Sequence, residues 1–248
     1  METDPTRRFT VRAENYARYR PGYPREILRL LERECGLSPA SWIADIGSGT
    51  GLLARVFLQF GCQVFCVEPN AEMRHAGERL MFRIPGFSSI DGRAEATGLP
   101  DNVVDFVTAG QAFHWFDPPV TRREFQRILK TGGWVVLVWN ERTEEPGFMS
   151  GYDALVRRFA VEREPVRNTE LDAFFGEGAW RMAQLGNQQQ FDLEGLKGRL
   201  NSSSYAPLPD SADYEPMMRE IERLFREHQS EGVVTFRYDT NVYWGRVK

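Results

Sequence analysis

A run of seven residues, Asp45–Ile46–Gly47–Ser48–Gly49–Thr50–Gly51, has the composition of a ligand-binding loop. Glycine adopts positive φ angles without strain and lets a ligand contact the backbone, and here three glycines alternate with other residues. The spacing is G-x-G-x-G, whereas a dinucleotide-binding loop reads G-x-G-x-x-G. An acid two residues before the first glycine is unfavourable beside a pyrophosphate and suits a cation. The pattern therefore predicts a loop that binds a ligand with a cationic group.

A second acidic residue, Glu68, follows 17 residues after Gly51, at the end of the next predicted strand. A carboxylate at this place can accept hydrogen bonds from both hydroxyl groups of a ribose. Taken alone, Glu68 could be a surface carboxylate at a strand end. The glycine loop upstream favours the ribose role.

Two later loops, Asp91–Glu95 and Gly110–Asp117, complete the set of candidate site segments. The second contains His114, the only histidine placed for general-base catalysis. A single histidine is more often a structural hydrogen-bonding group, so both readings of His114 stay open. The aromatic residues beside it could stabilise a cation or simply pack in the core.

Strand and helix patterns alternate along the first part of the chain and place each of these loops after a strand. The predicted helices are 24–35, 52–60, 72–82 and one that starts at Pro118 and stops at Gly132. The predicted strands are 41–46, 63–68, 87–91, 103–109 and 134–139. This alternation favours right-handed βαβ units and a doubly wound α/β sheet, in which ligands bind beyond the carboxyl ends of the strands.

The pattern weakens after Glu141, where polar helices and a strand candidate at 188–190 are expected. From Val234 to Trp244 every second residue is apolar or threonine, which predicts a long strand that completes the sheet in antiparallel orientation. We predict four parts: a cap and first helix (1–36), a Rossmann-like core (37–140), a variable helical region for the acceptor (141–232) and the final strand (233–248).

The ordered motifs resemble those of the class I S-adenosylmethionine-dependent methyltransferases over about residues 9–140. D-I-G-S-G-T-G is similar to the first motif of that family, and Glu68 begins a stretch that fits its E-P-N-x-x-M pattern. The A-F-H-W-F stretch and Trp139–Asn140–Glu141–Arg142 resemble the trans-aconitate methyltransferase type. The resemblance implies a seven-stranded Rossmann-like sheet and S-adenosylmethionine as cofactor. It also implies methyl transfer to a small acceptor, on oxygen of a carboxylate or hydroxyl group.

The resemblance also implies roles for individual residues, with Asp45 facing the amino group of the cofactor. Many members carry aspartate where this chain has Arg93, so the backbone around Arg93 is expected to contact the adenine. The implied acceptor residues are Trp115, Asn140, Ser204 and Tyr205, and His114 would be the base for a hydroxyl acceptor. The implied cofactor-binding residues are Asp45, Gly47, Ser48, Gly49, Gly51, Glu68, Pro69, Met73, Arg93, Ala94, Glu95 and Gln111, with Tyr19 and Arg20 from the N-terminal cap.

Composition limits the other functions. Lys plus Arg number 31 and Asp plus Glu 35, and this acidic balance disfavours binding to nucleic acid. Three cysteines and three histidines, without metal-site spacing, argue against a metal centre. We expect a cytoplasmic protein without a membrane segment, either monomer or homodimer. The alternatives are a methyltransferase for RNA or protein, a cofactor-binding module without catalysis and, less favoured, a nicotinamide-dependent oxidoreductase.

Overall fold

The structure is a computed structural model of the chain, and it describes residues 17–159, 168–203, 206–207 and 209–247. Its centre is a seven-stranded sheet with the strand order β3-β2-β1-β4-β5-β7-β6. Strands β1 to β5 are parallel, and β7 pairs antiparallel with both β5 and β6. The strands are β1 (Trp42–Ile46), β2 (Gln63–Val67), β3 (Phe87–Ile90), β4 (Val104–Gly110), β5 (Leu129–Arg142), β6 (Trp180–Phe191) and β7 (Val234–Gly245).

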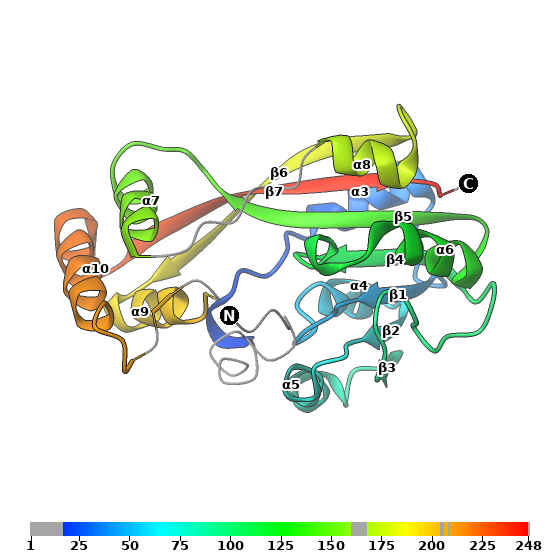
Figure 1. Cartoon of the computed structure of the whole chain (residues 1–248), viewed down its shortest axis with the longest axis horizontal. Helices are drawn as coiled ribbons and strands as arrows, with labels where there is room; N and C mark the ends of the chain where they lie inside the picture. Colours follow the sequence, from blue (N-terminus) through cyan, green and yellow to red (C-terminus); the bar gives the residue numbers. More distant parts are fainter. Residues whose placement is uncertain (1–16, 160–167, 204–205, 208, 248) are drawn as a thin grey trace.

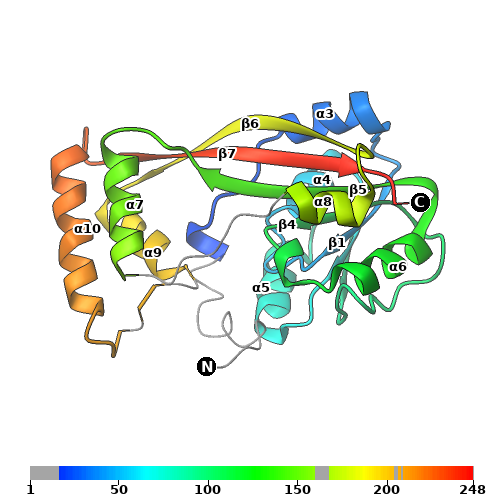
Figure 2. The same ribbon diagram turned by 45° about the horizontal axis from the view of Figure 1, so that its top comes forward.

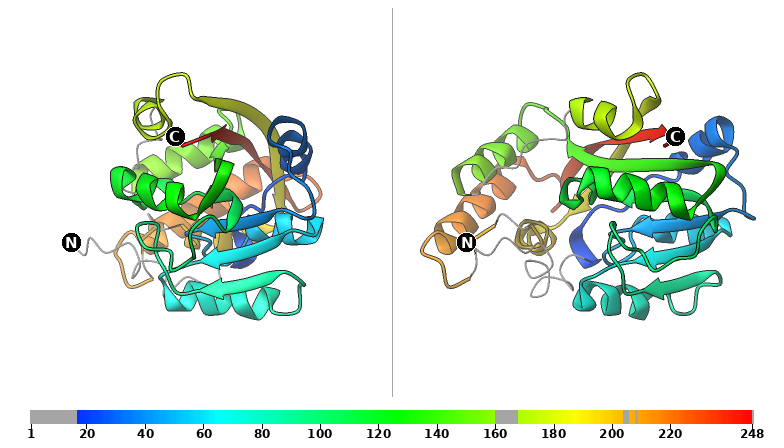
Figure 3. Two further views of the ribbon diagram at one scale, coloured as in Figure 1. Left: turned by 90° about the vertical axis from the view of Figure 1, so that its right-hand side faces the viewer. Right: turned by 45° about the vertical axis from the view of Figure 1, so that its right-hand side comes forward.

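The predicted α/β fold and its antiparallel last strands are confirmed, and helices cover both faces of the sheet (Figure 3). One core contains Phe125 and Phe174 from α6 and α8, and the core on the other face contains Ile27 and Phe57 from α3 and α4. The helices that flank the sheet are α3 (Glu26–Cys35), α4 (Ala54–Phe60), α5 (Ala71–Met81), α6 (Pro118–Ile128) and α8 (Asn168–Phe175).

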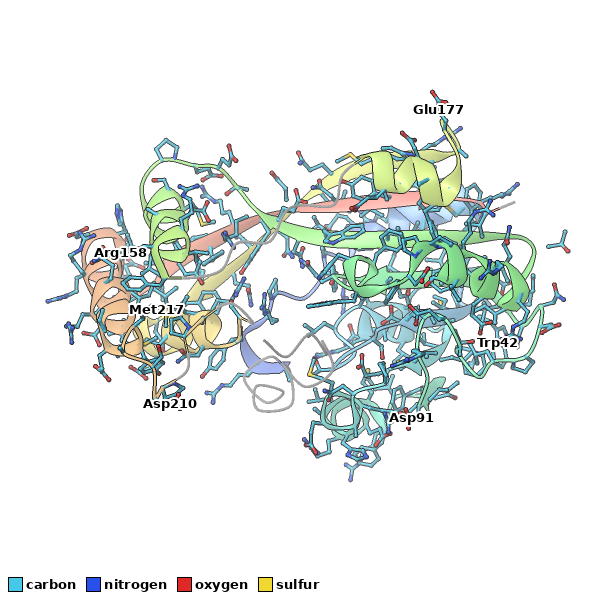
Figure 4. All side chains as sticks on the ribbon, in the orientation of Figure 1. Trp42, Asp91, Arg158, Glu177, Asp210 and Met217 are labelled. Atoms are coloured by element: carbon cyan, nitrogen blue, oxygen red, sulfur yellow. The ribbon has the colours of Figure 1, made fainter. Side chains whose placement is uncertain are left out.

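A separate group of helices, here called the helical lobe, lies away from the parallel strands (Figures 1 and 2). It consists of α7 (Phe148–Phe159), α9 (Leu193–Asn201) and α10 (Tyr214–His228), packed on the ends of β6 and β7. Its own apolar core is centred on Tyr152 and Phe236, whose rings lie 4.7 Å apart. In Figure 4, Arg158 and Met217 lie in this lobe, while Trp42 and Asp91 lie in the part of the molecule that contains the parallel strands.

Two features of the long strands differ from the sequence predictions. Gly132 does not end α6, because that helix stops at Ile128 and Gly132 lies inside β5 with a φ of 80°. The strand candidate at 188–190 is only the end of a twelve-residue strand, β6. Most of β6 was not predicted because it is an edge strand with many polar residues, so its sequence carries no apolar run.

The alternation predicted for the last strand is confirmed. The side chains of Val234, Phe236, Tyr238, Thr240, Val242 and Trp244 are all buried. Since β7 runs from the helical lobe to the parallel strands, its buried face contributes to the cores of both. Among the helices that the structure describes, none combines the length and the apolar character needed to cross a lipid bilayer.

Candidate functional site

A cavity of about 680 Å³ lies beyond the carboxyl ends of β1, β2 and β4. Ligand cavities typically measure about 300–1,000 Å³, so this one has room for a nucleoside-sized ligand. It opens where strand order predicts a site, between β1 and its neighbours. The lining residues are Gly47, Gly49, Glu68, Pro69, Asn70, Met73, Arg93, Ala94, Glu95, Gly110, Gln111, Ala112, Trp115, Phe116, Asp117 and Pro118.

The glycine loop forms one wall of the cavity and is tied to the end of β2. The backbone N–H groups of Gly47 and Ser48 both donate to the carbonyl of Val67, at 2.9 and 3.2 Å. Gly47 has a φ of 63°, and a Cβ there would lie 2.8 Å from the Cβ of Ala112. Glycine is therefore required at residue 47, both for its backbone conformation and for the close approach of the loop after β4.

Gly51 is needed for a different reason. A Cβ at this residue would lie 2.0 Å from Cε of Met81, on α5, and Gly51 is not among the lining residues. The last glycine of the loop thus permits tight packing of α5 rather than approach of a ligand. Ser48 likewise does not line the cavity, and its carbonyl accepts the N–H of Gly51 at 2.9 Å.

Glu68 follows β2, and its carboxylate connects the glycine loop to the start of α5. Its Oε2 accepts the N–H of Gly49 at 2.8 Å, and its Oε1 accepts the N–H of Asn70 at 2.9 Å. Only 8% of Glu68 is exposed, and this burial raises the pKa of its carboxyl group. Each oxygen keeps a second lone pair, so the carboxylate can accept further hydrogen bonds from a polyol in the cavity.

Asp45 lies beneath the glycine loop and does not line the cavity. It is 1% exposed, and its Oδ1 accepts the hydroxyl of Thr108 at 2.7 Å. Its Oδ2 is buried and makes no hydrogen bond of normal geometry within the described residues. Burial raises the pKa of Asp45 to about 7, because the charged form loses its hydration.

The segment after β3 forms the opposite wall. Arg93 and Ala96 exchange backbone hydrogen bonds, and this turn brings Ala94 and Glu95 to the cavity. Oε1 of Glu95 accepts the N–H of Asp117 at 2.9 Å, the residue that caps α6 by accepting the N–H of Val120. Glu95 therefore both lines the cavity and fixes the start of α6.

The segment after β4 carries the aromatic part of the site. Gln111 has a φ of 57°, which is unusual for a residue other than glycine, and its Nε2 donates to the carbonyl of Asn140 at 2.8 Å. The short helix η2 (Phe113–Trp115) follows, anchored by the buried ring of Phe113. Trp115 lines the cavity, whereas His114 is exposed and does not.

The structure brings together ten of the predicted residues and leaves others away from the cavity. Neither Tyr19 nor Arg20 lines it; the Arg20 guanidinium donates to the carbonyl of Ser202 at 3.2 Å, next to α9. Asn140 supplies its backbone carbonyl to Gln111, and its side chain is bonded elsewhere. Ser204 and Tyr205 lie outside the described residues.

Six lining residues were not given an individual role by the sequence, although four of them lie in the predicted site segment Gly110–Asp117. Asn70 is recognisable afterwards, since it precedes α5 as an N-cap residue and its Oδ1 accepts the N–H of Met73. The inward positions of the others depend on the path of the loops after β4, which no local pattern specifies. These other residues are Gly110, Ala112, Phe116, Asp117 and Pro118.

Comparison with known protein families shows what this part of the chain is similar to. The family described as a methyltransferase domain matches residues 44–137, which run from β1 into β5. The match includes the glycine loop and all the other residues that line the cavity.

Similar proteins carry the same description. An uncharacterized methyltransferase of Mycobacterium tuberculosis is 35% identical over 153 residues, which is 62% of this chain and 59% of that protein. An uncharacterized methyltransferase of Schizosaccharomyces pombe is 26% identical over 223 residues, covering 89% of this chain and 88% of that protein. A solved structure from Anaeromyxobacter dehalogenans, proposed to be a type II methyltransferase, has a TM-score of 0.71 at 24% identity. The similarity covers 92% of this chain and 98% of the Anaeromyxobacter chain.

Proposed function

We propose that the chain, whose residues 44–137 match a methyltransferase domain and whose sheet has the strand order of the class I fold, transfers a methyl group from S-adenosylmethionine to a small carboxylic acid. The single observation that carries the cofactor proposal is the position of Glu68. Its buried carboxylate lines the cavity beside the glycine loop, where it can accept the hydroxyl groups of a ribose.

The residues present fit this cofactor at two further points. The cradle at Gly47 has no room for a Cβ, so a ligand can contact its backbone. The aromatic rings of Trp115 and Phe116 offer faces to a sulfonium cation.

When bound, S-adenosylmethionine would supply a methyl group activated by its positively charged sulfur. Glu68 would then bind the ribose, and the segment Arg93–Glu95 would bind the adenine. Gln111 and the glycine loop would bind the methionine portion. Its contribution to rate would be to hold the acceptor in line with the methyl group and to exclude water. Nearly all the lining residues lie in the segments that directly follow strands β1 to β4, so the strands fix where these segments begin.

The choice of a carboxylic acid as acceptor rests on the protonation chemistry of the cavity. A carboxylate is already nucleophilic at neutral pH, whereas a hydroxyl group needs a base. The three lining carboxylates, Glu68, Glu95 and Asp117, each already accept a backbone N–H. The resemblance to the trans-aconitate type implies an oxygen acceptor, on a carboxylate or a hydroxyl group, and a carboxylate is one of these two.

We therefore predict that His114→Ala lowers kcat by less than about threefold, because a carboxylate acceptor needs no proton removed. If His114 were the base for a hydroxyl acceptor, kcat of the variant would instead fall by about 100-fold or more, and the pH profile of the wild type would show a histidine-like pKa. Steady-state kinetics from pH 5.5 to 8.5 with wild type and His114→Ala test whether His114 acts as the base.

The acceptor class can be tested directly with methyl-labelled S-adenosylmethionine and panels of small carboxylic acids, phenols and amines. Methyl esters are hydrolysed by mild base and release volatile labelled methanol. We expect base-labile, volatile label with the acids. Base-stable product, or label in added RNA or protein, would refute the proposed acceptor and leave the cofactor assignment intact.

A further inference from the structure

The segment just before α3, residues 17–23 (the N-terminal arm), lies between the helical lobe and the parallel core (Figure 1). At its lobe end, the ring of Tyr19 packs on α9 so closely that a Cβ at Gly198 would lie 2.3 Å from it. Arg20 donates to the carbonyl of Ser202 in the turn that follows α9. This end of the arm is therefore attached to the lobe.

The middle of the arm is held by two amide side chains of the sheet. The carbonyl of Gly22 accepts Nδ2 of Asn187, on β6, at 2.8 Å and Nδ2 of Asn140, on β5, at 3.1 Å. The same Asn187 Nδ2 lies 3.2 Å from Oδ1 of Asn140. The hydroxyl of Thr240, on the intervening strand β7, donates to that same oxygen.

The other end of the arm reaches the cavity wall. A Cβ at Gly110, a lining residue, would lie 2.5 Å from the hydroxyl of Tyr23, so the tyrosine packs directly on the end of β4. The next residue, Gln111, donates its side-chain amide to the carbonyl of Asn140. Asn140 thus contacts both the arm, through its side chain, and the cavity, through its backbone.

We infer that Asn187 is a positioning residue, which fixes the N-terminal arm across the sheet and thereby holds Tyr23 and Gln111 at the cavity wall. Asn187 is not among the lining residues of the cavity. Its side-chain amide bonds to Gly22 and Asn140, and it acts on the cavity through these two residues. Because β6 also carries the lobe, this contact links the position of the lobe to the cofactor cavity. The effect on cofactor binding rests on the function proposed above, whereas the attachment of the arm does not.

The test compares Asn187→Ala and Asn187→Asp with the control Gln188→Ala. Gln188 is the next residue of β6, with its side chain exposed on the opposite face of the strand. The aspartate variant keeps the size of the side chain but replaces the donor by an acceptor facing the carbonyl of Gly22. It should therefore perturb the arm more than alanine does.

Two readouts are measured on the full chain. The first is the rate of tryptic cleavage between Arg18 and Tyr19, since Arg20 precedes proline and is resistant. We expect cleavage of Asn187→Ala to be about fivefold faster than of the control, because the arm detaches more often. The second is the dissociation constant for S-adenosylmethionine, expected to rise about 3- to 10-fold, as loss of one hydrogen bond would give. The melting temperature should match that of the control.

Equal cleavage rates in Asn187→Ala, Asn187→Asp and Gln188→Ala would overturn the inference, whatever the cofactor result. Faster cleavage with unchanged cofactor affinity would overturn the link to the cavity. If wild type itself fails to bind S-adenosylmethionine, the proposed function falls, and the cleavage rates still decide whether Asn187 holds the arm.

Discussion

Replacing Glu68 by glutamine is expected to weaken binding of S-adenosylmethionine by about 100-fold or more. In the structure both carboxylate oxygens accept backbone N–H groups, from Gly49 and from Asn70. A glutamine must point its NH₂ group at one of these N–H groups, so it loses one bond and opposes two donors. A ribose bound there would also lose its charged acceptor. Hydrogen bonds to charged groups contribute about 1.5–3 kcal/mol each, and loss of about 3 kcal/mol of binding free energy corresponds to about 100-fold in Kd.

The matched control is Glu72→Gln, in the first turn of α5, where the side chain is exposed and does not line the cavity. Titration calorimetry on both variants separates a local effect from a change in net charge, since each substitution removes one negative charge. We expect Glu72→Gln to bind like wild type. Wild-type affinity in Glu68→Gln would show that this carboxylate does not contact the cofactor.

Replacing Asp45 by asparagine is expected to change how stability depends on pH. Burial raises the pKa of Asp45 to about 7 in the folded protein, against 3.8 for an unperturbed aspartate. Between these values the folded state binds more protons than the unfolded state, so the free energy of unfolding falls as pH rises. The contribution of this group to the free energy of unfolding is therefore fully present below pH 3.8 and is lost progressively as the pH rises to about 7.

Asparagine cannot ionise and removes this dependence. From pH 5 to pH 8, the unfolding free energy of the wild type should fall by about 2.5 kcal/mol relative to that of Asp45→Asn, by the linkage relation. Urea denaturation of both proteins at several pH values measures the difference, and any constant offset from the substitution cancels. A difference that stays constant across the range would mean that Asp45 titrates below pH 5 in the folded protein.

The parts of the site that sequence predicted best are those encoded by short, local patterns. The loop Asp45–Gly51 and the acid Glu68 each follow a buried apolar strand, and strand ends in a parallel sheet meet at one edge. The start of α6 was equally local, because Asp117 and Pro118 are a capping residue and a first-turn proline. For such residues, chain neighbours determine the position.

Residues whose role depends on distant partners were predicted less well. Asp45 was expected to face the cofactor, but the fold buries it against Thr108, 63 residues away, below the cavity. Tyr19 and Arg20 were expected at the cofactor and are held instead by α9 and the turn after it. Nothing near these residues in sequence specifies such contacts, because they depend on how the helical lobe packs against the arm.

The helical lobe and the edge strand β6, on whose end it packs, were the least predictable parts. Strand β6 has glutamine or asparagine at five of twelve positions, a composition without the apolar alternation that marks a half-buried strand. The strand is held by its pairing with β7 over its full length, from Trp180 to Phe191. Its position is therefore determined by β7, whose alternating pattern was visible.

The most direct test of the central proposal is isothermal titration of the purified, dialysed protein with S-adenosylmethionine, with NADH as the control ligand. We expect micromolar binding of S-adenosylmethionine at a stoichiometry near one and no heat of binding with NADH. Binding of NADH without S-adenosylmethionine would contradict the assignment and favour an oxidoreductase. Absence of binding to both ligands would mean that the cavity beside Glu68 does not hold this cofactor.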